Sequence, residues 1–187
     1  MRVLTLSTML QTAAQDWSSE VFAAMRSLGI GNVCTIPDGG LTPLLRMCED
    51  DPGTRVLTLS TEEEGIGITT GLWLGGARGM TALQSSGVGN CINALTLPAA
   101  LDVPCLMLVT MRGQYGEFNH WQIPMGQAAE RVLTEIGVRC YPVDRAEDVC
   151  PAFIAAANMA FNANQRCAVL IGQRVIGAKA FGRAEDG

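Results

Sequence analysis

Three consecutive glutamates, Glu62, Glu63 and Glu64, stand where a short strand-like run gives way to a helix-like segment. Acidic residues in a first helical turn interact favourably with the helix dipole, so one role for them is to begin the helix. A carboxyl group directly after a strand also projects from the edge of a sheet. In an apolar cleft the pKa of such a carboxyl is raised, and the group can share a proton with a ring nitrogen. Both roles remain open for this cluster.

The helix predicted after these glutamates, over 62–77, is rich in small residues. Gly65, Gly67 and Gly71, with two threonines between them, give it a surface without large side chains. Each glycine in a helix interior lowers helix stability by about 1 kcal/mol relative to alanine. We therefore expect another backbone or a flat ligand to lie close to this helix.

A second glycine-containing segment, 84–90, reads Gln-Ser-Ser-Gly-Val-Gly-Asn and lies between a predicted strand and a predicted helix. The backbone N–H groups of such a loop can bind an anion at the start of a helix. The segment does not match a dinucleotide fingerprint, because Ile92 occupies the third glycine position, and no Gly-Lys pair follows to make a P-loop. It remains a candidate anion-binding loop.

The third candidate is a long polar loop, 111–124, which follows the most apolar strand-like run of the chain. Long loops beyond a buried strand are usually functional. Arg112 is the only cation of the loop at neutral pH, and it could bind an anionic substrate or pair with Glu117 to brace the loop. His120 is the only histidine of the chain, and it could transfer a proton near neutral pH or pack against Trp121.

Alternating strand-like and helix-like runs must position these residues. Six predicted strands, separated by helices, predict a single α/β domain with a six-stranded, mainly parallel sheet and helices on both faces. The predicted strands are 33–36, 55–59, 80–84, 104–110, 139–143 and 167–171, and the predicted helices are 18–28, 41–48, 62–77, 90–100, 126–136 and 146–163.

In such sheets, ligands bind beyond the carboxyl ends of the strands. Pro37 and Asp38, which follow the first predicted strand, therefore join the candidate site. We assign residues 18–172 to the domain. Residues 1–17 are predicted to be an N-terminal extension, either an extra strand or disordered, and 173–187 a C-terminal tail.

Composition narrows the classes of protein. Of 187 residues, 48% are hydrophobic and 17% charged, the net charge is −5, and no basic stripe indicates a nucleic-acid partner. The longest apolar stretch, 94–109, contains two prolines and an aspartate, which argues against a membrane span. Seven cysteines without a Cys-x-x-Cys pair are typical of reduced core thiols. We expect a soluble, cytoplasmic protein with part of its surface covered by other subunits.

Together these segments resemble the pyrimidine-binding domain of thiamine diphosphate-dependent 2-oxo acid decarboxylases. Within that superfamily the chain is most similar to the sulfopyruvate and phosphonopyruvate decarboxylases. The resemblance spans roughly 18–172 and is carried by four segments, which are 36–38, 62–67, 84–95 and 112–126.

The resemblance implies roles for individual residues. The invariant glutamate of the superfamily lies nine residues before a helix glycine, so Gly71 indicates Glu62 as the residue that contacts N1′ of the aminopyrimidine and activates the cofactor. His120 would be a second catalytic residue. The remaining implied cofactor contacts are Gln84, Gly87, Gly89 and Asn90, and the implied substrate contacts are Pro37, Asp38, Arg112, Glu117 and His120.

The resemblance also implies a partner. In the family a separate Gly-Asp-Gly domain holds the diphosphate and Mg²⁺, and this sequence lacks that motif, so we expect no metal ligand in this chain. A beta subunit would complete each site in an α₂β₂ or larger assembly. The expected substrate is a short anionic 2-oxo acid such as sulfopyruvate or phosphonopyruvate. A carboligase subunit and a non-catalytic regulatory subunit remain as alternatives.

Overall fold

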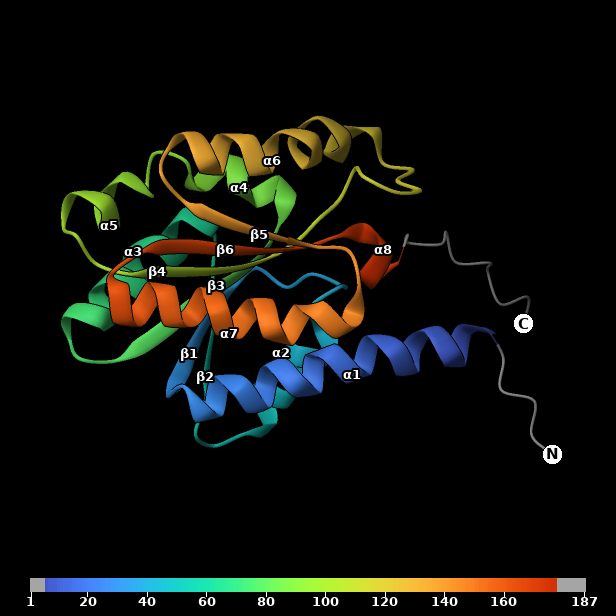
Figure 1. Cartoon of the computed structure of the whole chain (residues 1–187), viewed down its shortest axis with the longest axis horizontal. Coiled ribbons are helices and arrows are strands. Elements are labelled where there is room, and N and C mark those ends of the chain that lie inside the picture. Colours follow the sequence, from blue (N-terminus) through green and yellow to red (C-terminus); the bar gives the residue numbers. More distant parts are fainter. Residues whose placement is uncertain (1–5, 178–187) are drawn as a thin grey trace.

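One parallel sheet organises the molecule (Figure 1). The computed structural model describes residues 6–177, and side chains from residue 17 onward. Within these residues the sheet has six strands in the order β2-β1-β3-β4-β6-β5, and every pairing is parallel. The predicted α/β fold with a six-stranded sheet is confirmed. The strands are β1 (Ile30–Thr35), β2 (Arg55–Thr58), β3 (Arg78–Gln84), β4 (Cys105–Thr110), β5 (Arg139–Val143) and β6 (Arg166–Ile171).

Helices cover both faces of the sheet, as predicted (Figure 1). One face is covered by α1 (Leu6–Ser27), α2 (Thr42–Asp50) and α7 (Ala146–Ala163). The other face is covered by α3 (Glu62–Leu74), α4 (Ser85–Cys91), α5 (Thr96–Ala100) and α6 (Ile123–Glu135). None of the helices in the described part of the chain is long and apolar enough to cross a membrane.

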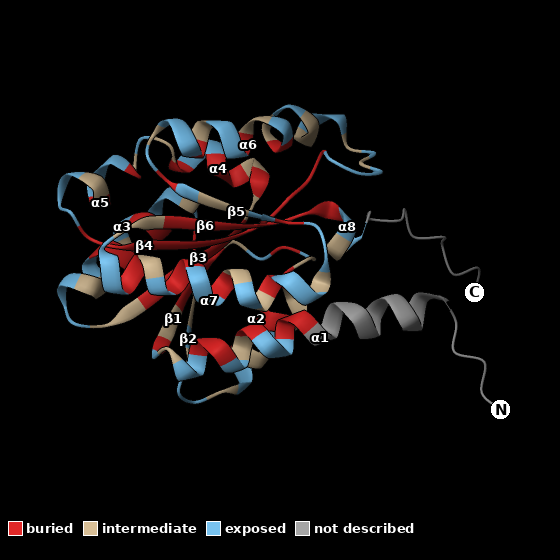
Figure 2. Cartoon of the chain, viewed as in Figure 1, coloured by how far each residue is buried: buried red, intermediate tan, exposed pale blue. Residues whose placement is uncertain are grey.

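The core explains why the strands read as continuous apolar runs. All six residues of β4 are buried, and alternate side chains point to opposite faces. Leu106 and Leu108 pack under α1 and α7, whereas Met107 and Val109 pack under α4 and α6. Figure 2 shows the same division, with buried residues in the sheet and on the inner sides of the helices.

The glycines of α3 serve different purposes. A Cβ atom on Gly65 would lie 2.8 Å from Thr81 Cγ2 on β3, so this glycine lets the helix approach the sheet. A Cβ atom on Gly67 or Gly71 would meet nothing within 4 Å. The small-residue surface expected from the sequence therefore divides into one position needed for packing and two that face open space.

Two segments differ from the sequence prediction. The 84–90 segment is not a loop, because β3 runs to Gln84 and α4 begins at the next residue. Packing of α4 between α3 and α6 outweighs the low helix propensity of its glycines. The helix predicted over 90–100 is correspondingly divided between α4 and α5.

The predicted domain boundaries were drawn inside folded elements. Residues 6–16, assigned to an extension, continue α1 without a break. Gln173, assigned to the tail, is fully buried and begins the short helix α8 (Gln173–Ile176). Residues 1–5 of the predicted extension and 178–187 of the predicted tail lie outside the described residues. All seven cysteines lie within the described range and are free thiols.

The contrast between the α3 glycines can be tested by alanine substitution. We expect Gly65→Ala to destabilise the chain by about 1–3 kcal/mol, because its Cβ overlaps Thr81. Gly71→Ala should stabilise it by up to about 1 kcal/mol, because alanine favours the helix and the space is open. Urea unfolding followed by circular dichroism measures both. Equal effects of the two substitutions would contradict the assignment.

Candidate active site

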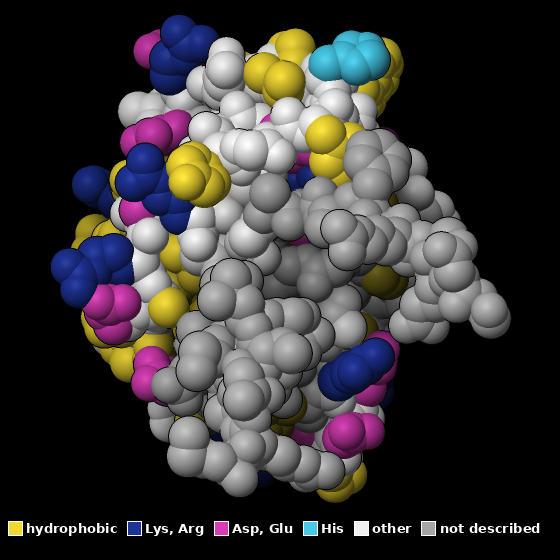
Figure 3. Space-filling model, turned by 90° about the vertical axis from the view of Figure 1, so that its right-hand side faces the viewer, with side chains coloured by type: hydrophobic (Ala, Val, Ile, Leu, Met, Phe, Trp, Pro, Cys, Tyr) yellow, Lys and Arg dark blue, Asp and Glu magenta, His cyan; other side chains and the backbone are white. Residues whose placement is uncertain are grey.

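The site lies between β1 and β3, two neighbouring strands whose following helices pack on opposite faces of the sheet. From β1 the chain passes to α2 on one face of the sheet, and from β3, the next strand in the sheet, it passes to α4 on the other face. In open parallel sheets, ligands bind beyond the carboxyl ends of the strands at such a point. We call the edge formed by these strand ends the carboxyl edge. On the visible part of this edge, acidic and basic side chains are interspersed rather than gathered by sign (Figure 3).

Glu62 is the first residue of α3 and is half-buried against α4. Asn90 Nδ2 donates a hydrogen bond to Glu62 Oε2 at 2.7 Å. A Cβ atom on Gly87 would overlap the Cγ, Cδ and Oε1 atoms of Glu62, so a larger residue there would displace the Glu62 side chain. Glu62, Gly87 and Asn90, which the sequence predicted for one site, are thus brought together.

The other two glutamates are placed differently. Glu64 Oε2 accepts a hydrogen bond from the backbone N–H of Ser60 at 2.9 Å, which closes the start of the helix. Glu63 is exposed. The sequence left open whether the cluster begins the helix or belongs to a site. In the structure Glu64 begins the helix, and Glu62 is the member that remains a site candidate. Of the three side chains, Glu62 is the one that packs against Gly87 and Asn90 of α4.

Asp38 joins the ends of three neighbouring strands and is 8% exposed. Its Oδ1 accepts a hydrogen bond from Gln84 Nε2 at 2.7 Å, at the end of β3. Its Oδ2 accepts from Thr110 Oγ1 at 2.9 Å, at the end of β4, and from Gly40 N at 3.0 Å. Asp38 and Gln84, both predicted site residues, thus fix the ends of β1, β3 and β4 relative to one another.

The loop after β4 connects to this network through Gln122. Gln122 Nε2 donates to Gln84 Oε1 at 2.8 Å, and Ser86 Oγ donates to the same oxygen at 2.8 Å. Gln122 Oε1 is buried and has no hydrogen-bond partner among the described residues. A buried acceptor without a donor is costly, so this atom has the capacity to receive a ligand N–H. Sequence analysis did not single out Gln122.

Arg112 and Glu117 form a buried, two-pronged ion pair. Arg112 Nε donates to Glu117 Oε2 at 2.7 Å and Nη2 donates to Oε1 at 2.9 Å, with the two side chains 3% and 2% exposed. Burial raises the pKa of Glu117, but hydrogen bonds from Arg112 and from the Asn119 backbone, together with the Arg112 charge, lower it to about 2. The bracing alternative for Arg112 is therefore the arrangement found, and its guanidinium does not face an open cleft.

Gln173 holds the same loop from the other side. Its Oε1 accepts from the backbone N–H groups of Gln114 at 3.0 Å and Tyr115 at 2.9 Å. Its Nε2 donates to Glu117 Oε2 at 3.1 Å. Sequence analysis missed Gln173 because it follows the last strand without any pattern that marks it, 59 residues from its partner Gln114.

The remaining predicted residues occupy the surface or the helix contacts. His120 begins a 3₁₀ turn (His120–Gln122) and is exposed, and its side chain makes no hydrogen bond or ion pair within the described residues. Pro37 is exposed after β1. Gly89 faces α6, where a Cβ atom would lie 3.3 Å from Met125 Sδ. In the part of the chain that the structure describes, no cluster of three acidic, histidine or cysteine side chains could hold a metal ion.

Comparison with known proteins identifies the family. The chain is 30% identical over 155 residues to the sulfopyruvate decarboxylase subunit alpha of Methanococcus maripaludis, an alignment that covers 82% of this chain and 93% of that relative. The chain belongs to the family of sulfopyruvate decarboxylase alpha subunits. The family predicted from the four sequence segments is thereby confirmed. No family model matches the chain.

Other relatives of this sulfopyruvate decarboxylase family member agree. The subunit alpha of Methanothermobacter thermautotrophicus is 35% identical over 119 residues, covering 63% of this chain and 72% of the relative. A phosphonopyruvate decarboxylase of Streptomyces viridochromogenes is 38% identical over 101 residues, covering 54% of this chain and 25% of the relative.

A solved structure supports the fold. The 2-oxoglutarate:ferredoxin oxidoreductase from Magnetococcus marinus, with 2-oxoglutarate, coenzyme A and succinyl-CoA bound, superposes with a TM-score of 0.70 and 16% identity. The match covers 86% of this chain and 29% of that chain. At this identity the likeness concerns the fold alone.

The Arg112–Glu117 pair predicts a pH dependence of stability. The pKa of Glu117 falls from 4.5 to about 2 in the folded chain, so the pair stabilises the fold above the unfolded pKa. That contribution is lost as the pH falls from 4.5 towards 2. Glu117→Gln should destabilise the chain at neutral pH by about 3 kcal/mol, because it leaves the Arg112 charge buried and unpaired.

Urea unfolding at a series of pH values measures this, with Glu135→Gln, an exposed glutamate on α6, as the matched control. The stability difference between the wild type and Glu117→Gln should shrink over the acid range. A difference that stays constant down to the lowest pH would show that the pair does not stabilise the loop.

Proposed function

We propose that this chain is the alpha subunit of a thiamine diphosphate-dependent decarboxylase of a short anionic 2-oxo acid, such as sulfopyruvate or phosphonopyruvate. The observation that carries the proposal is the half-buried carboxylate of Glu62, held by Asn90 over the glycine surface of α4. Membership of the sulfopyruvate decarboxylase family supports the reaction and the substrate class.

The residues at the carboxyl edge fit the pyrimidine half of thiamine diphosphate. Gly87 leaves room for the carboxyl of Glu62 to lie against α4, where it would meet the ring nitrogen. Asn90 borders the same surface through its hydrogen bond to Glu62. Gln84 precedes α4, and Gly89 lies on the side of α4 that contacts α6. When bound, thiamine diphosphate supplies the carbon that adds to the 2-oxo group and accepts the electrons left when CO₂ departs.

The chain's own residues would position the bound ring and exchange a proton with it. Glu62 would exchange a proton with the ring nitrogen N1′, and its Oε2 is oriented for this by the Asn90 amide. Gln122 Oε1, a buried acceptor, would receive an N–H of the bound ring or of the substrate.

The substrate side would be formed by Pro37, Asp38 and the loop after β4. His120, exposed in that loop, is our candidate for proton transfer to the product carbon. Arg112 and Glu117 act on the substrate indirectly, by bracing the loop. We therefore assign the sulfonate or phosphonate group to a cation of the partner chain.

The proposal includes a beta subunit that carries the diphosphate and Mg²⁺ site, in an α₂β₂ or larger assembly. The name "subunit alpha" of the relatives supports a partner. Gly67 and Gly71 support one as well, because they leave open space on α3 at a cost in helix stability. Leu74, at the end of the same helix, is 65% exposed. A partner chain packed on α3 would account for all three residues.

The role of Glu62 predicts a selective loss of activity. In the assembled enzyme, Glu62→Gln should lower kcat by about 10²–10⁴-fold, because an amide cannot exchange the proton. Glu63→Gln, at an exposed position, should keep near-normal turnover. Glu64→Gln keeps an acceptor for the Ser60 N–H and should do the same. Steady-state kinetics with sulfopyruvate and phosphonopyruvate would refute the assignment if Glu62→Gln stayed active while a neighbour did not.

The shared site predicts a dependence on the partner chain. Calorimetry on this chain alone should detect weak binding of thiamine diphosphate that Mg²⁺ does not strengthen. Co-purification with the beta subunit should produce tight, Mg²⁺-dependent binding together with decarboxylation. Tight, Mg²⁺-dependent binding by the isolated chain would exclude a site divided between two polypeptides.

A further inference from the structure

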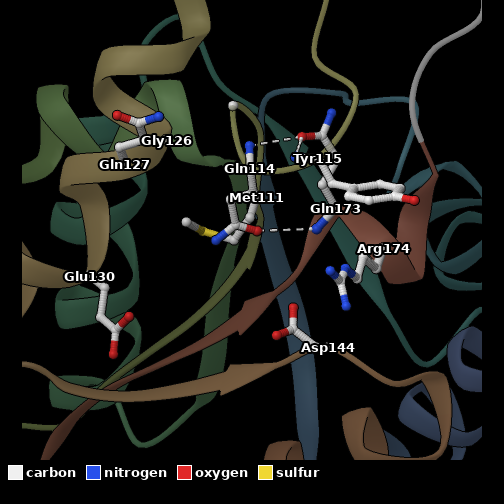
Figure 4. A pocket seen from close by; sticks show the side chains of 10 residues that line it. Met111, Gln114, Tyr115, Gly126, Gln127, Glu130, Asp144, Gln173 and Arg174 are labelled. Carbon is white, nitrogen blue, oxygen red and sulfur yellow. Dashed lines mark hydrogen bonds between the residues drawn. The ribbon is translucent and has the colours of Figure 1, made fainter.

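A separate cavity of about 510 Å³ opens at the other half of the carboxyl edge, beyond β4, β5 and β6 (Figure 4). Met111 and Gln173, both buried, line its inner part. Glu130, Asp144 and Arg174 line its outer part. Its volume is in the range of small-molecule sites. Glu62, Asp38 and Gln84 are not among the residues that line it, and it shares only the loop after β4 with the candidate active site.

The fold builds this cavity from elements that are distant in sequence. Asp144 directly follows β5, Arg174 lies on α8 after β6, and Glu130 lies on α6. Gly172 makes room for Asp144, because a Cβ atom at Gly172 would overlap Asp144 Oδ1. The Gly172 N–H also donates to Val143 O at 2.7 Å, which fixes the end of β6 beside the end of β5. The carboxylate of Asp144 lies at the cavity wall, against Gly172.

Acidic and basic side chains both line this cavity, and they do not pair with each other. Within the described residues, the Glu130, Asp144 and Arg174 side chains form no ion pair. The Arg174 guanidinium lies over the ring of Tyr115, 5.1 Å from its centroid. Two carboxylates suit a ligand ammonium group, and a guanidinium suits a ligand carboxylate. A small ligand that carries both groups would match both signs of charge in the lining.

We propose that this cavity binds a small zwitterion of the amino-acid class, with its ammonium group between Glu130 and Asp144 and its carboxylate at Arg174. A 2-oxo acid lacks the ammonium group and would meet two like charges, so the cavity rejects that substrate class. The proposal does not depend on the decarboxylase function.

Occupancy of the cavity stabilises the loop after β4. Gln114 and Tyr115 line the cavity, and their backbone N–H groups are held by Gln173 in its wall. The same loop continues to Gln122, which hydrogen-bonds Gln84 beside Asp38. A ligand that restrains Arg174 and Gln173 therefore restrains the loop that reaches the candidate active site.

Thermal unfolding of the full chain tests the site. The proteinogenic L-amino acids, added one at a time, are the probes. At saturation at least one should raise the melting temperature by about 5 °C. L-Alanine is compared with ethylamine, which lacks the carboxylate, and with pyruvate, which lacks the ammonium group. A failure of every amino acid to shift the melting temperature, or an equal shift with ethylamine or pyruvate, overturns the proposal.

Matched variants locate the binding. Glu130→Gln combined with Asp144→Asn should abolish the shift, as should Arg174→Gln, and all three positions are exposed, so the fold is retained. Glu135→Gln, on the outer surface of the same helix, should keep the shift. A shift that survives the double variant places the ligand elsewhere and overturns the assignment.

Proteolysis tests the effect on the loop. Chymotrypsin has exposed targets at Phe118 and Trp121, which do not line the cavity. The amino acid that raises the melting temperature should slow cleavage at both positions in the wild type and not in the double variant. Unchanged cleavage with the ligand bound would refute the coupling to the loop. Neither measurement uses decarboxylation, so failure here leaves the proposed function to its own tests.

Discussion

Parallel pairing of all six described strands sends the carboxyl end of each one to the same edge of the sheet. Polar segments that are far apart in sequence therefore meet there. The Asp38 carboxylate uses this geometry directly, because it receives hydrogen bonds from Gln84 and Thr110 at the ends of two other strands. An unpaired carboxylate at this depth would be strongly destabilising, so the network fixes the three strand ends together.

The polar groups at the carboxyl edge differ in how deeply they are buried. The most buried ones brace the edge, and a less buried one can contact a ligand. The Arg112–Glu117 pair is almost fully buried, and Gln173 is completely so. Their hydrogen bonds are satisfied internally, and they brace the loop after β4. Glu62 is half-buried and held by a single amide, so one carboxylate oxygen is left for a ligand. That difference makes Glu62 the better candidate for chemistry.

The loop after β4 lies between the two ends of the carboxyl edge. On one side Gln122 ties it to Gln84, next to the proposed cofactor surface. On the other side Gln173 ties it to the wall of the second cavity. The loop therefore connects the two sites by direct hydrogen bonds. The proposed zwitterion and the proposed cofactor would therefore act on one shared element.

The sequence by itself determined the sheet and the covering helices, because strand and helix periodicity are local patterns. The choice of Glu62 rests on the resemblance to a known family, through the spacing to Gly71, and stays a prediction. Tertiary structure alone decided how α4 folds against Glu62, which partner Arg112 takes and that Gln173 belongs to the core. These depend on contacts such as the one between Gln173 and Gln114, 59 residues apart. Local propensity carries no information about such a contact, because packing of distant elements, not the segment's own pattern, sets its energy.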